Sequence, residues 1–260
     1  MTDDDHALAR DLAEQAGQRL LELRAHGGDP DVLRKAGDRL SHEFLTRELA
    51  DRRPGDVVLS EEGADNPARL DARRVWIVDP LDGTREFGEP GRTDWAVHVA
   101  LWERSGTSGP GDLTAGAVAL PAQGKVLSTT GAEQQQCSAG AGRASGRIRI
   151  VVSRTRAPRF VRDISDLIDA ELVSLGSAGA KVAAVIDGEV DAYVHGGGFY
   201  EWDTAAPVAV ARAAGLHASR IDSSALAYNQ ADLLMPDILV CRPAVAGVLL
   251  QAIREVTNAS

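Results

Sequence analysis

The chain has 260 residues, of which 44% are apolar and 25% charged, a composition typical of a globular protein. Its net charge of −10 works against binding a polyanion such as DNA or RNA, and no apolar stretch approaches the roughly 18 residues of a membrane span. The acidic start, Met1 to Asp5, is unlike a secretory signal peptide, and Cys137 and Cys241 lie too far apart for a Cys-x-x-Cys motif. We therefore expect a cytoplasmic protein that binds no nucleic acid polymer and no membrane.

The first half of the chain predicts two helices followed by strands. Apolar residues recur every three or four positions over residues 8–23, which is typical of an amphipathic helix, and Gly27-Gly28-Asp29-Pro30 should end it. A second helix is expected over residues 38–49. Short apolar or alternating runs predict strands over residues 56–59, 75–78, 96–102, 115–120 and 125–129.

Strands and helices alternate in the second half of the chain. Residues 138–146 carry few large side chains and are expected to form a loop between the two halves. Strands are predicted over residues 147–152, 172–175, 192–195 and 238–241, and helices over residues 158–169, 179–187, 203–214 and 243–256. This pattern indicates the α/β class, with α+β character in the N-terminal half. We expect one compact unit with an N-terminal subdomain (1–142) and a C-terminal subdomain (143–260).

Acidic residues recur where a predicted element ends or begins. Glu61 and Glu62 follow one strand, Asp79 and Asp82 follow the next, and Asp203 opens a helix. Such positions are where α/β folds place ligands. Carboxylates about 4 Å apart repel one another by roughly 1–4 kcal/mol per pair, so a cluster is stable only with bound cations. Because all these ligand atoms are oxygens, the pattern predicts a Mg²⁺ site.

The segment Asp79-Pro80-Leu81-Asp82-Gly83-Thr84 is the most specific of these signals. Its proline keeps the preceding aspartate extended, and its glycine allows a sharp turn with an exposed amide. The two carboxylates can then converge, with the Leu81 carbonyl between them. The same residues also favour an ordinary turn. The paired glutamates upstream and Trp202-Asp203-Thr204-Ala205-Ala206 downstream favour the metal site instead.

These three motifs resemble the signatures of the inositol monophosphatase superfamily of lithium-sensitive, Mg²⁺-dependent phosphatases. The resemblance runs from the first helix to the last and implies the layered αβαβα sandwich of the sugar phosphatases. Arg85-Glu86-Phe87, Val152-Ser153-Arg154 and Glu201 are most similar to the CysQ-type 3′(2′),5′-bisphosphate nucleotidases. That branch implies hydrolysis of 3′-phosphoadenosine 5′-phosphate to AMP, in sulfate assimilation.

The resemblance also implies roles for individual residues and two or three Mg²⁺ ions per active site. The metal ligands would be Glu61, Asp79, the Leu81 carbonyl, Asp82 and Asp203. The catalytic residues would be Glu61, Thr84 and Asp38, the last two orienting the attacking water. The substrate contacts would be Asp82, Gly83, Thr84, Ser153, Arg154, Ser177, Lys181, Glu201 and Asp203. Phe199 and Tyr200 would either stack on adenine or pack in the core.

Several alternatives stay open at this point. Leu33-Arg34-Lys35-Ala36-Gly37-Asp38 departs from the family's Val-Thr-x-Ala-Asp, so the Arg34-Lys35 pair either contacts substrate phosphate or forms a solvated helix start. The alternative substrates are inositol 1-phosphate and fructose 1,6-bisphosphate. An inactive nucleotide-binding sensor is an alternative of another class, although no metal ligand is missing. A homodimer is common in the family. The six histidines show no metal-binding spacing and are expected to be scattered surface or core residues.

Overall fold

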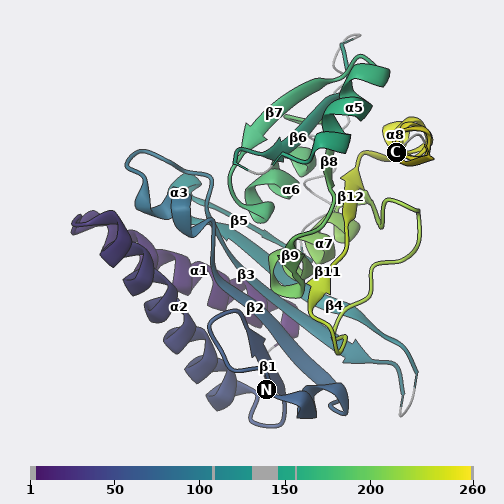
Figure 1. Ribbon diagram of the computed structural model, residues 1–260. Coiled ribbons are helices and arrows are strands. Elements are labelled where there is room, and N and C mark those ends of the chain that lie inside the picture. The colour runs from purple at the N-terminus through teal and green to yellow at the C-terminus, as the bar shows by residue number, and fades with distance from the viewer. Residues whose placement is uncertain (1–3, 107–108, 131–145, 156, 259–260) are drawn as a thin grey trace.

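Two five-stranded β-sheets form the centre of the fold, with helices on and between them (Figure 1). The computed structural model describes residues 4–106, 109–130, 146–155 and 157–258. The first sheet, in the order β1-β2-β3-β4-β5, contains β1 (Val57–Ser60), β2 (Arg74–Asp82), β3 (Ala96–Arg104), β4 (Gly111–Leu120) and β5 (Lys125–Ser128). The second, in the order β10-β12-β8-β6-β7, contains β6 (Arg149–Ser153), β7 (Glu171–Leu175), β8 (Ala192–His195), β10 (His217–Ser219) and β12 (Ile238–Cys241). A short pair joins β9 (Phe199–Tyr200) to β11 (Leu234–Met235).

The helices complete five layers. Helices α1 (Asp5–Ala25) and α2 (Pro30–Arg52) cover the outer face of the first sheet, and α6 (Ala178–Ile186) and α7 (Glu201–Ala213) lie between the sheets. Helices α5 (Arg159–Leu167) and α8 (Pro243–Asn258) cover the outer face of the second sheet, and the short α3 (Thr84–Gly88) follows β2. This order confirms the predicted αβαβα sandwich. None of the described helices is both long and apolar enough to cross a membrane.

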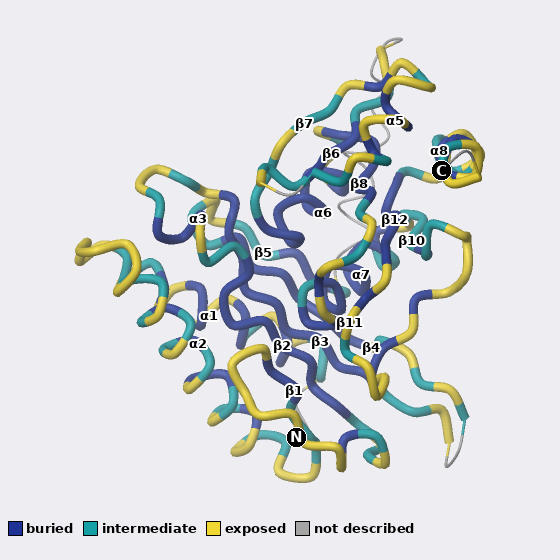
Figure 2. The backbone as a smooth tube through the Cα atoms, viewed as in Figure 1, coloured by how far each residue is buried: buried dark blue, intermediate teal, exposed yellow. Residues whose placement is uncertain are grey.

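The central strands of the first sheet bury both of their faces. On β2, Trp76 and Val78 pack toward α1 and α2, whereas Val75 and Ile77 pack toward α6 and α7. All four side chains are fully buried, and the middle of the molecule is correspondingly dark in Figure 2. A strand covered on both faces needs apolar residues at successive positions, which explains why this segment reads as a continuous apolar run.

Helix α2 begins at Pro30, earlier than the expected start at residue 38. Asp29 caps it, because its carboxylate accepts hydrogen bonds from the amides of Asp31 (2.9 Å) and Val32 (3.1 Å). Proline is favoured at the first position of a helix, where no amide hydrogen is needed. The Asp29-Pro30 pair therefore both follows one helix and begins the next. As a result, Asp38 lies inside α2 instead of at its start.

Strand β2 runs through Asp82, whereas the sequence predicted that it would end before Asp79. Its pairing with β3 becomes irregular between Asp79 and Asp82. Gly83 then adopts a left-handed conformation (φ 84°) and precedes the first turn of α3. The two aspartates thus belong to an irregular strand end, and only Gly83 makes the turn.

The other predicted helices and strands are present in the structure, with ends that differ by a few residues. The short elements α3, β9, β10 and β11 were not predicted, because segments of two to five residues carry too little periodicity. Of the predicted loop over residues 138–146, only residue 146 lies within the described part of the chain. The expected subdomain boundary at 142/143 lies outside it as well.

Candidate active site

A cavity of about 540 Å³ brings together most of the predicted site residues. Its walls come from the end of β2, the start of α3, the end of β6, the connection before α6 and the start of α7. Of the predicted residues, those that line it are Glu61, Asp79, Leu81, Asp82, Gly83, Thr84, Ser153, Arg154, Ser177 and Asp203. The cavity therefore draws on both sheets and on segments far apart in the sequence.

Strand pairing explains how Glu61 reaches Asp79. Strands β1 and β2 are parallel, and Ser60 pairs with Val78. The Glu61 amide donates to the Val78 carbonyl oxygen at 3.4 Å. Glu61 and Asp79, which follow Ser60 and Val78, therefore lie side by side. Parallel neighbours end at the same edge of a sheet, which is where α/β proteins bind ligands.

Asp79, Asp82 and Asp203 each offer a carboxylate oxygen, and these three atoms lie within 4.8 Å of one another. Each side chain is held by a backbone amide. Asp79 Oδ1 accepts from Leu81 (3.0 Å), Asp82 Oδ2 from Gly179 (2.9 Å) and Asp203 Oδ2 from Tyr200 (2.6 Å). The carboxylates are thus fixed close together before any ligand binds.

Burial and neighbouring acidic charges raise the pKa of Glu61 and of Asp79. Burial, followed by the charge of Asp203, raises the pKa of Glu61 to about 7, although a hydrogen bond with Asp79 opposes the shift. Burial and then the charges of Glu61, Asp82 and Asp203 raise the pKa of Asp79 well above its usual range. A bound divalent cation would remove this repulsion, and the all-oxygen ligand set fits Mg²⁺.

Asp38 does not line the cavity but lies directly behind it. Thr84 Oγ1 lies 3.3 Å from Asp38 Oδ1, and burial, followed by the charge of Glu62, raises the pKa of Asp38 to about 6. Helix α2 can approach α3 this closely because residue 37 is glycine. A Cβ atom there would lie 2.8 Å from the Phe87 ring, closer than real contacts allow. The residues before Asp38 depart from the family pattern, but the Asp38 carboxylate still lies beside Thr84.

The Arg34-Lys35 pair does not reach the cavity. Arg34 Nη1 donates to Asp31 Oδ1 at 2.8 Å on the same helix, and its side chain packs against Gly88. Lys35 is exposed. This arrangement favours the solvated helix face over the phosphate contact that the sequence left open.

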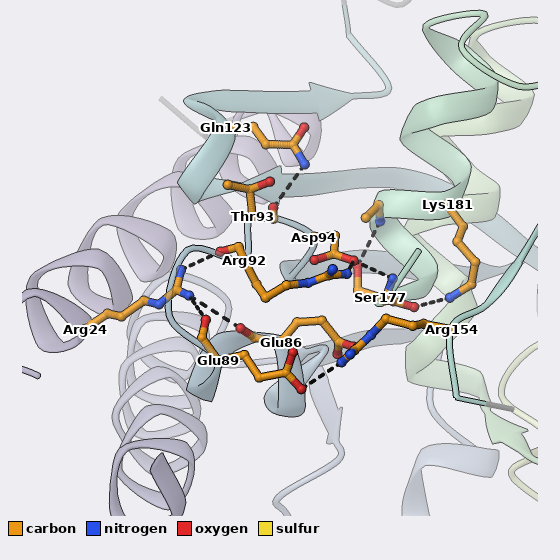
Figure 3. Close-up of polar contacts among 12 residues, drawn as sticks. Arg24, Glu86, Glu89, Arg92, Thr93, Asp94, Gln123, Arg154, Ser177 and Lys181 are labelled. Carbon is orange, nitrogen blue, oxygen red and sulfur yellow. Dashed lines mark hydrogen bonds and ion pairs between the residues drawn. The ribbon is translucent and has the colours of Figure 1, made fainter. Parts of the chain in front are cut away.

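Arg154 is held against the N-terminal half of the chain by two glutamates (Figure 3). Its Nε and Nη2 atoms donate to Glu86 Oε1 at 3.1 and 2.7 Å, and Nη2 also donates to Glu89 Oε1 at 2.8 Å. Arg24 Nη2 donates to the Glu89 carbonyl oxygen at 2.6 Å and fixes the segment after α3. The sequence indicated Arg154, but it did not indicate Glu89 or Arg24.

Asp94 fixes the part of the cavity wall formed by Gly176 and Ser177. Its Oδ2 atom accepts from the Gly176 amide at 2.7 Å, and its carbonyl oxygen accepts from the Ser177 amide at 3.1 Å (Figure 3). Asp94 also pairs with Arg92. The position of Ser177 therefore depends on a loop of the other half of the chain, which no local sequence signal revealed.

Two predicted substrate residues, Lys181 and Glu201, do not line the cavity. The Lys181 ammonium is buried behind the wall and donates to the Gly176 carbonyl oxygen. Glu201 is fully buried, and its carboxylate accepts from the amides of Asn229 and Gln230, both at 2.7 Å. Burial raises the pKa of Glu201 to about 7. Both residues therefore support neighbouring backbone from outside the cavity wall, and direct contact with substrate stays a prediction.

The two aromatic residues of β9 differ in their surroundings. Phe199 is buried and packs edge-on against His195, with ring centroids 5.1 Å apart. Tyr200 is exposed and stacks on Trp202, with centroids 4.8 Å apart. Phe199 is thus a core residue, and neither aromatic residue is among those that line the cavity.

Comparison with known proteins identifies the family. Residues 6–258 match the sequence model of the inositol monophosphatase family. The chain belongs to this family. A 3′-phosphoadenosine 5′-phosphate phosphatase of Mycobacterium leprae is 52% identical over 258 residues, which cover 97% of this chain and 94% of that protein. The 3′(2′),5′-bisphosphate nucleotidase CysQ of Escherichia coli is 30% identical over 84% of this chain and 91% of its own length.

Comparison with a solved structure places this chain in the same family. The crystal structure of CysQ from Bacteroides thetaiotaomicron, a bacterial member of the inositol monophosphatase family, matches with a TM-score of 0.74 and 28% identity. The match covers 92% of this chain and 97% of that chain. The predicted family and the predicted fold are thereby confirmed.

Proposed function

We propose that this chain is a Mg²⁺-dependent phosphomonoesterase that removes the 3′-phosphate of 3′-phosphoadenosine 5′-phosphate to give AMP. The chemistry rests on the three aspartates whose oxygens lie within 4.8 Å of one another at the cavity. The substrate rests on the 52% identical relative, which carries the name of this phosphatase. Both point to the same class of reaction, hydrolysis of a phosphate monoester.

We assign the metal ligands to the carboxylates of Glu61, Asp79, Asp82 and Asp203 and to the Leu81 carbonyl. All five residues line one cavity, and three of the carboxylates are already held by backbone amides. Bound Mg²⁺, two or three ions in this proposal, would activate water and neutralise the charge of the transferred phosphoryl group. We also assign a catalytic role to Glu61, which follows β1 and lies beside Asp79.

We assign the orientation of the attacking water to Thr84 and Asp38. The Thr84 hydroxyl lies 3.3 Å from Asp38 Oδ1, and when it donates there its lone pairs remain available to accept a hydrogen bond from water. The pKa of Asp38, raised to about 6, suits a group that accepts a proton near neutral pH. Gly83 and Thr84 are the residues of this turn that contact the phosphate.

The far wall of the cavity supplies the remaining substrate contacts in this proposal. Ser153, Arg154 and Ser177 line it, and Arg154 carries the positive charge that a second phosphate requires. Lys181 and Glu201 act through the backbone they support. A role in sulfate assimilation, lithium sensitivity, a cytoplasmic location and a homodimer are further expectations of the same assignment.

Turnover of three substrates by the purified chain with Mg²⁺ tests the assignment. We expect kcat/KM for 3′-phosphoadenosine 5′-phosphate to exceed the values for inositol 1-phosphate and fructose 1,6-bisphosphate, with AMP and phosphate as products. A higher value for either sugar phosphate would replace the nucleotide as substrate. The Asp82→Asn variant tests the metal assignment, because it removes the charge of one ligand while nearly keeping the shape of the side chain. Full activity of that variant would refute the metal assignment, and binding without turnover in the wild type would indicate a sensor.

A further inference from the structure

We propose that His98 is a positioning residue that holds Asp82 and the first turn of α7 at a fixed separation and thereby sets the affinity for Mg²⁺. The proposal deepens the proposed function and rests on its metal site. His98 lies on β3 and is fully buried. It does not line the cavity, but its ring lies behind two of the residues assigned as ligands.

The imidazole contacts both of these ligand-bearing segments. Its Nε2 atom lies 3.2 Å from Asp82 Oδ2, at the end of β2. Its Nδ1 atom lies 3.2 Å from the carbonyl oxygen of Trp202, the residue before Asp203 in α7. Because Asp82 and Asp203 are far apart in the sequence, no local backbone contact fixes their distance. The ring of His98 lies between Asp82 and Trp202: its Nδ1–H donates to the Trp202 carbonyl oxygen, and its Nε2 atom packs against the Asp82 carboxylate.

A third segment completes the arrangement around Asp82. The Gly179 amide, in the first turn of α6, donates to the same Asp82 Oδ2 atom at 2.9 Å. A Cβ atom at residue 179 would overlap His98 Nε2, so glycine is needed for the ring to fit. Ala96, two residues before His98, also has little side chain on this face of the strand. Small neighbours thus make room for an imidazole between the first sheet and α6.

The Gly179 amide occupies one oxygen of the Asp82 carboxylate, against which the imidazole also packs, and leaves the other oxygen for a cation. Groups that contact metal ligands from behind fix the orientation of those ligands, and their loss typically lowers metal affinity by roughly 10- to 100-fold. Asp82 and Asp203 would both hold the cation, so a change in their separation would weaken both ligand contacts at once. We expect an effect of this size for His98.

Mg²⁺ binding to the metal-free protein, measured by isothermal titration calorimetry, tests the proposal without relying on turnover. His98→Ala should raise the Kd for Mg²⁺ by about 10- to 100-fold. His98→Gln places an amide near the Nε2 position, toward Asp82, and His98→Asn places one near the Nδ1 position, toward Trp202. Each should raise the Kd less than His98→Ala. Gly179→Ala should weaken binding in the same way, because its methyl group displaces the ring.

Val99→Ala is the matched control, because Val99 is a fully buried neighbour on the opposite face of β3. It should lower the melting temperature and leave the Kd unchanged. If His98→Ala is folded and binds Mg²⁺ like the wild type, His98 has no positioning role and the proposed function stands. If His98→Ala does not fold, a wild-type Kd in both His98→Gln and Gly179→Ala would overturn the proposal equally. Failure of the wild type to bind Mg²⁺ would overturn the metal site and this inference with it.

Discussion

The hydroxyl of Thr84 lies 3.3 Å from the carboxylate of Asp38, and the same hydroxyl lies 3.0 Å from the Leu81 carbonyl oxygen. A hydroxyl has one proton and donates to one acceptor at a time. A cation bound by the Leu81 carbonyl would compete for that oxygen and turn the hydroxyl toward Asp38. The Asp38–Thr84 pair would then be complete only in the metal-bound enzyme.

We expect Asp38→Asn to lower kcat by about 10²- to 10⁴-fold, the usual contribution of a positioned proton acceptor. The Kd for Mg²⁺ should stay unchanged, since Asp38 does not line the metal cavity. Steady-state kinetics at saturating Mg²⁺, together with calorimetric titration, separate the two effects. Thr84→Ser should remain active, whereas Thr84→Val should resemble Asp38→Asn. The exposed neighbour Arg39→Ala serves as the control, and an active Thr84→Val variant would remove the hydroxyl from the mechanism.

Metal removal should make the stability of the protein depend on pH. Burial and neighbouring charge raise the pKa of Glu61 to about 7 in the folded chain, so folding favours its protonated form. The stability from this group is present below the ordinary glutamate pKa, declines as pH rises, and is lost above about pH 7. Since Mg²⁺ binds only deprotonated ligands, its stabilising effect should grow over the same interval.

Thermal unfolding between about pH 5 and pH 8, with EDTA or with Mg²⁺, measures this relationship. The increase in Tm on adding Mg²⁺ should be larger at pH 8 than at pH 5. Glu61→Gln should make the Tm of the metal-free protein depend less on pH, and Mg²⁺ should raise its Tm by less than that of the wild type. Glu43→Gln, at an exposed position of α2, should behave like the wild type. An equal gain from Mg²⁺ at both pH values would show that Glu61 is already ionised without metal.

Periodicity was enough to predict most of the fold. Apolar repeats gave the long helices, and continuous apolar runs gave the strands that are buried on both faces. The predicted element boundaries were wrong where residues typical of a turn or a helix end belong to a neighbouring element. Asp29 and Pro30 look like the end of a helix, yet they cap and begin the next one. Asp79 to Asp82 looks like a turn, yet pairing with β3 extends the strand through it.

The site was predictable where its residues lie in compact motifs. Asp79, Asp82 and Asp203 could be named because each sits in a short, distinctive segment, and the structure places their oxygens within 4.8 Å of one another. His98 was missed, because a single histidine in an apolar strand looks the same whether it fills a core or contacts a ligand-bearing residue. Glu201 was assigned to substrate on position alone, and only the packing of the loop at Asn229 shows that its carboxylate is used inside the protein. Contacts between elements distant in sequence leave no local pattern.

Arg154 should distinguish substrates by their second phosphate. If it binds that phosphate, Arg154→Ala should raise KM for 3′-phosphoadenosine 5′-phosphate by about 10- to 100-fold, the equivalent of a charged hydrogen bond. KM for adenosine 3′-monophosphate, which lacks the second phosphate, should change much less. Arg154→Lys keeps the charge but loses the planar fork that Glu86 and Glu89 hold, so it should recover only part of the affinity.

The exposed Arg147→Ala is the control for charge alone, since Arg147 pairs with Asp169 at the surface. Equal increases of KM for both nucleotides in Arg154→Ala would show that the arginine merely orders the segment after α3. Steady-state kinetics of the two nucleotides side by side therefore decide between a substrate contact and a structural one.

Arg69 should be important for stability and not for chemistry. Its buried guanidinium donates to Asp65 Oδ1 at 2.6 Å and to Asn229 Oδ1 at 2.9 Å, and so joins the segment after β1 to the loop that contacts Glu201. Arg69→Met should lower the free energy of unfolding by about 2–3 kcal/mol, because a charged hydrogen bond and a buried amide partner are lost. Urea unfolding at pH 7 measures this, with the exposed Arg73→Met as control.

The loop at Asn229 also leads to a stability prediction for Glu201. Both carboxylate oxygens accept backbone amides, from Asn229 and Gln230, and Asn229 adopts a left-handed conformation with φ of 58°. Glu201→Gln would place an NH₂ group against one of these amides, where two donors face each other. We expect this substitution to cost about 1–3 kcal/mol of unfolding free energy, the penalty for an unsatisfied buried donor. A variant as stable as the wild type in urea would show that the Asn229 loop does not depend on the Glu201 carboxylate.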